Sequence, residues 1–342
     1  MTIQHARPFS RREFVAGLGL AGTAGFLGVT APPVTADPPP ETATIRLIYD
    51  PDISAVCYAP QFVAEELLRA EGFTDVRYVR LVEGSEAKTL VTGQADLSAE
   101  FTGDLILASD AGRPIVILAG LHMGCLELVG SAPIRTLRDL QGKTVAVSAL
   151  GGADQTFLAV MVAYVGLDPR KDVNWVVHAP ADALRAFTEG QFDAFMTFPP
   201  FAQEFRTRTA GHVIVKTATD HPWSQYFCCM LAAHREFVRR NPIATKRALR
   251  AILKATDMCA AEPDRTARLL ADKGYVSRYD LVLQFLQDVP YARWRDFSPE
   301  DTLRFYGLRL HEIGMIKSTP QKVIAQGTDW RFFNELKKEL KG

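Results

Sequence analysis

The stretch Leu140–Val165, LQGKTVAVSALGGADQTFLAVMVAYV, combines the features of a strand, a glycine turn and a helix. Thr144–Val147 is a short run rich in β-branched residues, which is typical of a buried strand. Gly151 and Gly152 then interrupt the chain, and from Ala153 the apolar residues recur at helical spacing. The free N–H groups and the positive dipole at such a helix start favour small anions or polar ligand ends. The alternative is a structural turn in which glycine supplies a positive φ.

The first 36 residues have the features of an export signal. Ser10–Val15 contains Arg11 and Arg12, an apolar and glycine-rich run follows at 16–29, and small residues end at Ala36. This pattern resembles a twin-arginine signal with cleavage after Ala36, and it predicts a periplasmic protein. A signal that is retained as a membrane anchor is the alternative, although the run is short and rich in Gly and Ala for a permanent span.

The rest of the chain is long enough for two lobes and nearly neutral. Of the 342 residues, 306 follow Ala36, enough for two separate cores. Three of the 39 basic residues and one of the 39 acidic residues lie before that point, so the net charge beyond it is −2. This balance argues against nucleic acid or an anionic membrane as the partner.

The five cysteines cannot all pair within one chain because their number is odd. Cys57 and Cys125 fall in predicted loops, so a disulfide between them is one option in an oxidising compartment. Cys228 and Cys229 stand in an apolar run, where we expect them to pack as small hydrophobic residues. Cys259 lies on a predicted helix.

Predicted strands alternate with predicted helices along most of the chain. Ile45–Tyr49 is a strand, a helix runs from Pro60 to a stop at Gly72, and 76–82 is the next strand. Beyond Asn241-Pro242 the chain is largely helical. This alternation predicts parallel α/β units.

A short motif occurs in two distant parts of the chain. Gly93–Asp96 reads GQAD and Gly190–Asp193 reads GQFD, and in both a helix ends on glycine before a short strand. One copy precedes the glycine-pair helix and the other follows it, which suggests two lobes of similar construction.

Several motifs together resemble a known family. They are Ala59–Glu65 (APQFVAE), the two GQxD segments, Asp139–Val147 (DLQGKTVAV) with the glycine pair, and Asn241-Pro242. In this order they resemble the substrate-binding proteins of ABC importers for nitrate, sulfonates, taurine and thiamine-type pyrimidines, the SsuA/THI5-like or NMT1 family. The resemblance covers roughly residues 43–340.

The resemblance implies an α/β protein with the two-lobe periplasmic-binding-protein fold of type II. Its ligand cleft would lie between lobes that two crossing strands join. The implied ranges are 43–124 plus 232–342 for lobe I, 130–225 for lobe II, and 125–129 and 226–231 for the hinge strands. The loops at the strand ends would then line the cleft.

We expect the ligand site to consist of residues at these loops. Aromatic side chains there can stack on a flat ligand or simply pack within a lobe. Carboxylates there can accept hydrogen bonds from ligand amines or cap helices. The expected ligand-binding residues are Tyr58, Glu83, Ser85, Glu100, Phe101, His122, Gly151, Gly152, Ala153, Asp154, Phe198 and Trp223.

The residue types in these loops favour some ligands over others. None of the loops contains Lys or Arg, and a small hydrated anion usually needs cationic donors, so we expect a flat or partly apolar organic ligand rather than nitrate or bicarbonate. His122 and Cys125 have the spacing of a metal pair. Residues three apart in a strand face opposite sides, however, so we expect no metal and no cofactor.

The expected function is an extracytoplasmic solute-binding protein. It would capture a small sulfonate-, taurine- or pyrimidine-like ligand by hinge closure and deliver it to an ABC permease in the inner membrane. We expect a monomer without enzymatic activity. The alternatives are an enzyme on the same fold related to thiamine-pyrimidine synthesis, whose cysteine run Phe227–Met230 matches only sparsely, and a protein that presents its ligand to a sensor.

Export by the twin-arginine route is testable in the precursor. Replacing Arg11 and Arg12 with Lys should leave the precursor in the cytoplasm, because the arginine pair is the core of the signal. Cell fractionation with immunoblotting measures the outcome. Mature protein that reaches the periplasm by that route at the normal rate would contradict the prediction.

Overall fold

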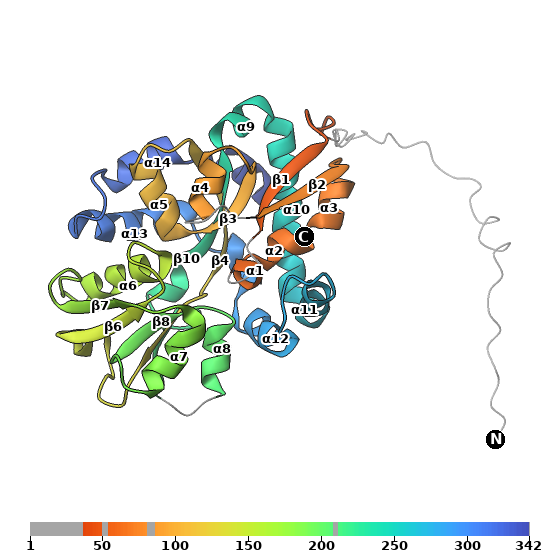
Figure 1. The fold of residues 1–342 in the computed structure, drawn as a ribbon. Coiled ribbons are helices and arrows are strands. Elements are labelled where there is room, and N and C mark those ends of the chain that lie inside the picture. The colour runs from red at the N-terminus through yellow and green to blue at the C-terminus, as the bar shows by residue number, and fades with distance from the viewer. Residues whose placement is uncertain (1–36, 50–53, 81–85, 208–210, 342) are drawn as a thin grey trace, which may run out of the picture. The chain divides into compact units, whose positions relative to one another are not determined.

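The strands form two separate five-stranded sheets. The computed structural model describes residues 37–49, 54–80, 86–207 and 211–341, and the part from Pro38 onward is one compact unit (Figure 1). The predicted export signal and the predicted site residues Glu83 and Ser85 lie outside the described residues. Within the described ranges, every helix is too short or too polar to cross a membrane.

The first sheet has the strand order β2-β1-β3-β10-β4. Strand β1 pairs in parallel with β2 and β3, whereas β10 runs antiparallel between β3 and β4. The strands are β1 (Thr44–Tyr49), β2 (Asp75–Arg80), β3 (Leu97–Phe101), β4 (Ile115–Met123) and β10 (Phe227–His234).

The second sheet, in the order β7-β6-β8-β5-β9, repeats this plan. Strand β6 is parallel to β7 and β8, and β5 is the antiparallel strand between β8 and β9. The strands are β5 (Glu127–Gly130), β6 (Lys143–Val147), β7 (Val173–Val177), β8 (Ala194–Thr197) and β9 (His212–Lys216). The chain therefore crosses between the sheets twice, at 124–126 and at 217–226.

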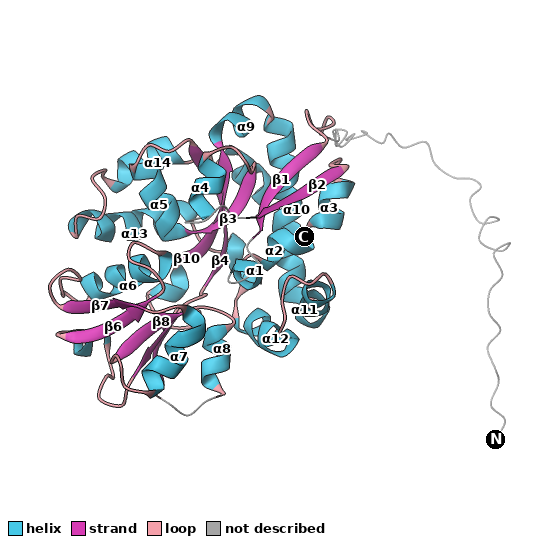
Figure 2. Ribbon diagram, in the orientation of Figure 1, coloured by secondary structure: helices cyan, strands magenta, loops and turns pink. Residues whose placement is uncertain are grey.

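Helices cover both sheets (Figure 2). The helices that connect strands of the first sheet are α1 (Ser54–Cys57), α2 (Ala59–Val63), α3 (Glu65–Ala70), α4 (Glu86–Val91) and α5 (Thr102–Asp110). The second sheet carries α6 (Ala153–Tyr164), α7 (Pro180–Thr188), α8 (Phe201–Arg206) and the 3₁₀ helix η1 (Leu137–Leu140).

The rest of the chain returns to the first sheet. Its 3₁₀ helices are η2 (Trp223–Gln225) and η3 (Tyr291–Arg295). Its α-helices are α9 (Arg235–Arg240), α10 (Pro242–Ala261), α11 (Pro263–Asp272), α12 (Tyr279–Asp288), α13 (Pro299–Glu312), α14 (Pro320–Gly327) and α15 (Arg331–Glu339). The single helix expected from Pro60 to Gly72 is instead divided between α2 and α3, because the chain turns at Ala64.

The central strands of the first sheet are buried on both faces. All nine residues of β4 and seven of the eight in β10 are buried. Although β4 is the last strand of its sheet, a bridge from Ile117 to Thr328 and the packing of η3, α14 and α15 cover it. Strands covered on both faces have continuous apolar sequences, which explains the unbroken run around Cys228.

The two GQxD segments make the same hydrogen bonds in the two sheets. The Asp96 carboxylate accepts the Arg46 N–H at 2.8 Å, and the Asp193 carboxylate accepts the Thr144 N–H at 2.9 Å. In return, the Asp96 N–H donates to the Arg46 carbonyl and the Asp193 N–H to the Thr144 carbonyl, both at 2.8 Å. Each aspartate thus fixes the start of one parallel strand against its neighbour.

The preceding glycines fit this arrangement. Gly93 and Gly190 have φ values of 70° and 75°, in the left-handed region that ends a helix and that other residues rarely adopt. The two sheets are therefore built in a similar way for the same physical reason. In each, a glycine ends a helix and the aspartate that follows links two strands.

Replacing either aspartate should destabilise the protein. Asp193→Ala and Asp96→Ala each leave a strand N–H without its acceptor, at an expected cost of about 1–3 kcal/mol in the free energy of unfolding. Urea denaturation measures this cost, and Gln94→Ala, a neighbouring exposed position, is the matched control. Unfolding free energies equal to that of the parent for both aspartate variants would contradict this role.

Candidate functional site

Two helix N-termini meet where the sheets face each other. Helix α5 follows β3 in the first sheet and α6 follows β6 in the second, and the two helices pack together. A Cβ placed on Gly103 would lie 2.7 Å from Thr156 Cγ2, so only glycine allows this approach. The Thr156 hydroxyl is buried and has no hydrogen-bond partner among the described residues.

The glycine turn before α6 is closed by side chains of the helix itself. Gly151 has φ +78°, and Gly152 is the extended N-cap residue. The Asp154 carboxylate accepts the N–H groups of Ser148 and Gln155, while the Gln155 side chain accepts the Gly151 N–H at 2.5 Å. These N–H groups are therefore occupied, and a carboxylate stands where the glycine pair suggested an anion.

The carboxylates at this place influence each other. Asp154 is buried, and burial raises its pKa despite the hydrogen bonds from Ser148 and Gln155. Burial and the nearby charge of Asp154 raise the pKa of Asp104, in the first turn of α5, to about 7. Glu100, at the end of β3, is fully buried. The meeting point of the two helices is therefore acidic.

Aromatic rings from both sheets meet beside these carboxylates. Phe101, at the end of β3, has its ring centroid 5.9 Å from that of Tyr58. On its other side Phe101 lies 6.4 Å from Phe198 and 6.3 Å from Phe157, both from the second sheet's half of the protein. All four rings are buried. Three predicted aromatic residues, Tyr58, Phe101 and Phe198, therefore form one group.

A small pocket opens at the carboxyl ends of the second sheet's parallel strands. Its wall includes Ser148 after β6, His178 after β7, Thr197 and Phe198 at the end of β8, and Asp154. None of its described lining residues is Lys or Arg. Sequence reasoning named Asp154 and Phe198 but missed the other three, although each follows or ends a strand. Ser148 follows the predicted strand at 144–147, and His178 comes to lie beside it because β7 pairs with β6.

Trp223 and His122 lie elsewhere. Trp223 packs between α6 and α13, with ring centroids 5.2 Å from Tyr164 and 6.0 Å from Phe305. His122, on β4, is fully buried, and its Nε2 lies 2.8 Å from the Cys57 carbonyl oxygen.

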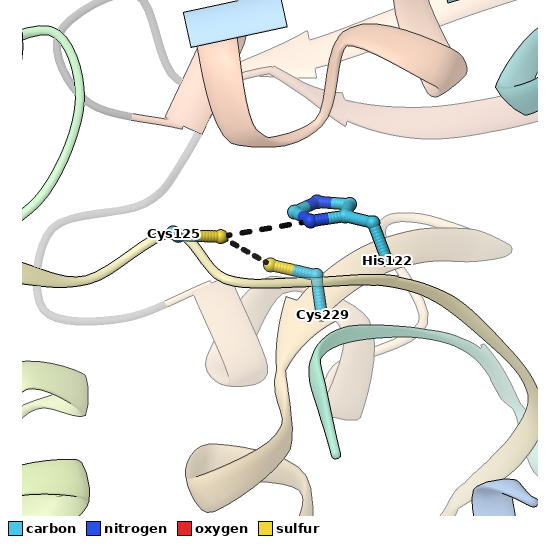
Figure 3. A group of neighbouring side chains, drawn as sticks. All are labelled: His122, Cys125 and Cys229. Atoms are coloured by element: carbon cyan, nitrogen blue, oxygen red, sulfur yellow. Dashed lines mark hydrogen bonds between the residues drawn. The ribbon is translucent and has the colours of Figure 1, made fainter. Parts of the chain in front are cut away.

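The expectation that His122 and Cys125 face opposite sides is wrong. Their Nδ1 and Sγ atoms lie 3.8 Å apart, and Cys125 Sγ lies 3.4 Å from Cys229 Sγ (Figure 3). The alternation of a strand ends here because β4 stops at Met123 and Gly124 turns with φ +72°. Cys229 is the register partner of His122 in the pairing of β10 with β4, which places it at the same point.

All five cysteines are free thiols and buried, so the optional disulfide between Cys57 and Cys125 is not formed. Burial raises the pKa values of Cys125 and Cys229. For Cys57, hydrogen bonds with these two thiols and the nearby His122 outweigh burial and lower the pKa to about 6. Of these thiols, Cys125 and Cys229 are in direct contact.

An ion-pair cluster joins the halves near the crossing segments. Asp288, at the end of α12, lies 2.5 Å from an Arg206 nitrogen and 3.0 Å from Lys216 Nζ. Arg206 also pairs with the buried Glu127 of β5. Burial opposes ionisation of Asp288, but the two cations outweigh burial and lower its pKa.

Comparison with known proteins gives the family. Residues 39–272 match the model of the NMT1-like family. The chain belongs to the NMT1-like family. It is 25% identical over 187 residues to a binding protein of Brucella abortus (strain 2308), a match of 54% of this chain and 57% of that protein. The chain thus matches little more than half the length of its curated relatives.

Solved structures confirm the predicted fold of this NMT1-like protein. The periplasmic nitrate-binding protein NrtA from Synechocystis PCC 6803 is similar with TM-score 0.73 and 17% identity, over 88% of this chain and 90% of that one. The alkanesulfonate-binding protein SsuA from Xanthomonas axonopodis pv. citri, bound to MOPS, is similar with TM-score 0.65 and 18% identity, over 85% of this chain and 99% of that one. The architecture is therefore the α/β periplasmic-binding-protein fold of type II.

The acidic meeting point predicts a specific dependence of stability on pH. Asp104 keeps its proton in the folded state up to about pH 7, whereas in the unfolded state it loses the proton near its ordinary pKa of 3.8. The folded state therefore binds more protons in this window, and stability falls as the pH rises through it. Asp104→Asn should flatten that fall.

Urea denaturation at several pH values between about 4 and about 8 measures this dependence. Asp301→Asn, an exposed position in the first turn of α13, is the control. A pH slope in Asp104→Asn as steep as that of the parent would contradict the prediction.

Proposed function

We propose that this NMT1-like protein is an extracytoplasmic solute-binding protein that captures a small organic ligand between its lobes and delivers it to an ABC permease. The family, the type II fold and the predicted export signal support this function. The segments that cross between the sheets, at 124–126 and 217–226, would serve as the hinge. The similar proteins from Brucella abortus, Synechocystis and Xanthomonas axonopodis are binding proteins, which favours a binding role over an enzymatic one.

The observation that carries the proposal is the group formed by Tyr58, Phe101 and Phe198. Phe101 ends β3 and Phe198 follows β8 of the other sheet, and their ring centroids lie 6.4 Å apart at a tilt of 38°. A flat ligand that parts these rings would contact both lobes at once. Such a ligand gains its full set of contacts only in the closed state, so it shifts the population toward that state.

The charges around this group favour a ligand that donates hydrogen bonds. Asp104 and Asp154 stand at facing helix starts and repel each other, and the pocket beside them has neither Lys nor Arg in its described lining. A ligand N–H group or a cationic amine would offset that repulsion, whereas a sulfonate or nitrate would add to it. The buried Thr156 hydroxyl offers a further polar partner. Of the ligand classes expected from the sequence, a pyrimidine-like compound fits best.

The predicted site residues divide accordingly. Tyr58, Phe101 and Phe198 would hold the flat face of the ligand, and Asp154 with Asp104 would accept its donors. Gly151, Gly152 and Ala153 would position Asp154 rather than bind an anion. Glu100 and His122 would form the layer beneath the rings, and Trp223 would support α6.

Binding assays with defined compounds test the proposal. Thermal shifts of the mature protein should be positive with aminopyrimidines and near zero with taurine, alkanesulfonates and nitrate. By calorimetry, Phe198→Ala should weaken aminopyrimidine binding by tenfold or more, because it removes one wall of the group. Phe305→Ala is the matched control, since Phe305 stacks on Tyr226 at 4.0 Å, outside this group.

The same measurements can contradict either the proposed ligand class or the proposed binding function. Tight binding of a sulfonate or nitrate would refute the ligand class but keep the binding function. Apo melting temperatures separate folding defects from binding defects in Phe198→Ala. If mass spectrometry finds no small molecule released from the freshly purified protein, and no compound class shifts its melting temperature, the solute-binding function itself is wrong.

A further inference from the structure

A histidine and two cysteines meet at the first crossing between the sheets. His122 comes from β4, Cys125 from the segment after Gly124, and Cys229 from β10 (Figure 3). The ligand atoms of these three side chains all lie within 4.8 Å of one another. Segments distant in sequence thus supply one nitrogen and two sulfur atoms to a single buried point.

Each imidazole nitrogen of His122 faces a backbone carbonyl oxygen: Nε2 lies 2.8 Å from that of Cys57, and Nδ1 lies 3.2 Å from that of Met123. A neutral imidazole has one N–H group, and the shorter contact favours Nε2 as the donor. A cation bound at Nδ1, which lies 3.8 Å from Cys125 Sγ, would take the place of the longer contact. A ligating histidine whose other nitrogen donates to a backbone carbonyl is the usual arrangement around a protein-bound metal.

The spacing of the donors suits a small tetrahedral site. In a tetrahedral site with Zn–S of roughly 2.3 Å and Zn–N of roughly 2.0 Å, donor atoms lie about 3.5–3.8 Å apart. The structure has 3.8 Å between Nδ1 and the Cys125 sulfur and 3.4 Å between the two sulfurs. The remaining pair, His122 and Cys229, lies within 4.8 Å, so a shift of up to about 1 Å would complete the geometry.

Tyr291 provides a second, independent observation. Its hydroxyl is buried and has no hydrogen-bond partner among the described residues, and its ring lies 4.8 Å from the imidazole of His122. A buried donor without an acceptor is costly, and a charged, metal-bound thiolate nearby would be a stronger acceptor than a neutral thiol.

We propose that His122, Cys125 and Cys229 bind one thiophilic d¹⁰ cation, Zn²⁺ or Cu⁺. Each cysteine that ligates gives up its thiol proton to solvent as the metal–sulfur bond forms, and the neutral imidazole gives up none. Cys125 also lines a small surface pocket with Gln203 and Asp288, which offers a route for the cation. The alternative is a purely structural role, in which the thiols pack as small hydrophobic residues.

The metal alone is the probe, used on reduced mature protein stripped with a chelator under anaerobic conditions. Native mass spectrometry should find one equivalent of Zn²⁺, and the melting temperature should rise. Co²⁺ in place of Zn²⁺ should give a thiolate-to-metal charge-transfer band, which reports sulfur ligation directly. Competition with a Cu⁺-specific chelator then decides which of the two cations is held more tightly.

Variants locate the binding. Cys125→Ala and Cys229→Ala should each weaken Zn²⁺ binding at least tenfold, whereas Cys259→Ala, a buried thiol on α10, should not. Because a buried variant can fail to fold, the Co²⁺ spectrum of the parent chain stands as a separate readout. The proposal is overturned if the reduced parent binds no stoichiometric Zn²⁺ or Cu⁺, if Co²⁺ gives no thiolate band, or if the purified chain instead carries a Cys125–Cys229 disulfide and no metal after reduction.

Discussion

The close approach of α5 and α6 is the constraint on which the region between the sheets depends. It requires glycine at position 103, and it brings Asp104 and Asp154 together from different sheets. Repulsion between the two carboxylates disfavours this approach, and below about pH 7 protonation of Asp104 relieves it. Elsewhere, the ion pairs of Asp288 with Arg206 and Lys216 join the same two halves of the protein. The structure therefore combines opposing electrostatic effects between these halves, and a ligand with hydrogen-bond donors would add to the favourable side.

The sequence predicted the repeated parts of this design well because they rest on local chemistry. The strand, glycine turn and helix at 144–164 follow from residue periodicity and from the special conformation of glycine. The repeated GQxD motif suggested that the two lobes share a local structure. In the structure, Asp96 and Asp193 make the same pair of hydrogen bonds. A capped helix stop followed by a strand is encoded within a few residues, so it can be read without knowledge of the fold.

The site itself depended on contacts that local patterns do not encode. That Phe101 and Phe198 would approach within 6.4 Å follows only from how the sheets face each other. The glycine turn was expected to favour small anions or polar ligand ends, but the Gln155 side chain accepts the Gly151 N–H and the Asp154 carboxylate accepts those of Ser148 and Gln155. Asp104 was missed because its raised pKa arises from burial and from Asp154, 50 positions away, and both depend on the fold. Ser148 and His178 were missed because their proximity depends on strand order.

The cysteine group shows the same limit most clearly, and it also links the parts of the molecule. Strand alternation correctly separates residues three apart, but it fails for His122 and Cys125 because β4 ends between them at Met123. Strand register then places Cys229 opposite both His122 and Phe101, so the three form one row across the first sheet. Phe101 belongs to the aromatic group, and Cys229 to the group of metal-ligand side chains. A cation at Cys229 and a ligand at Phe101 would therefore bind to the same row of residues, and any change that one makes in the affinity of the other must be reciprocal.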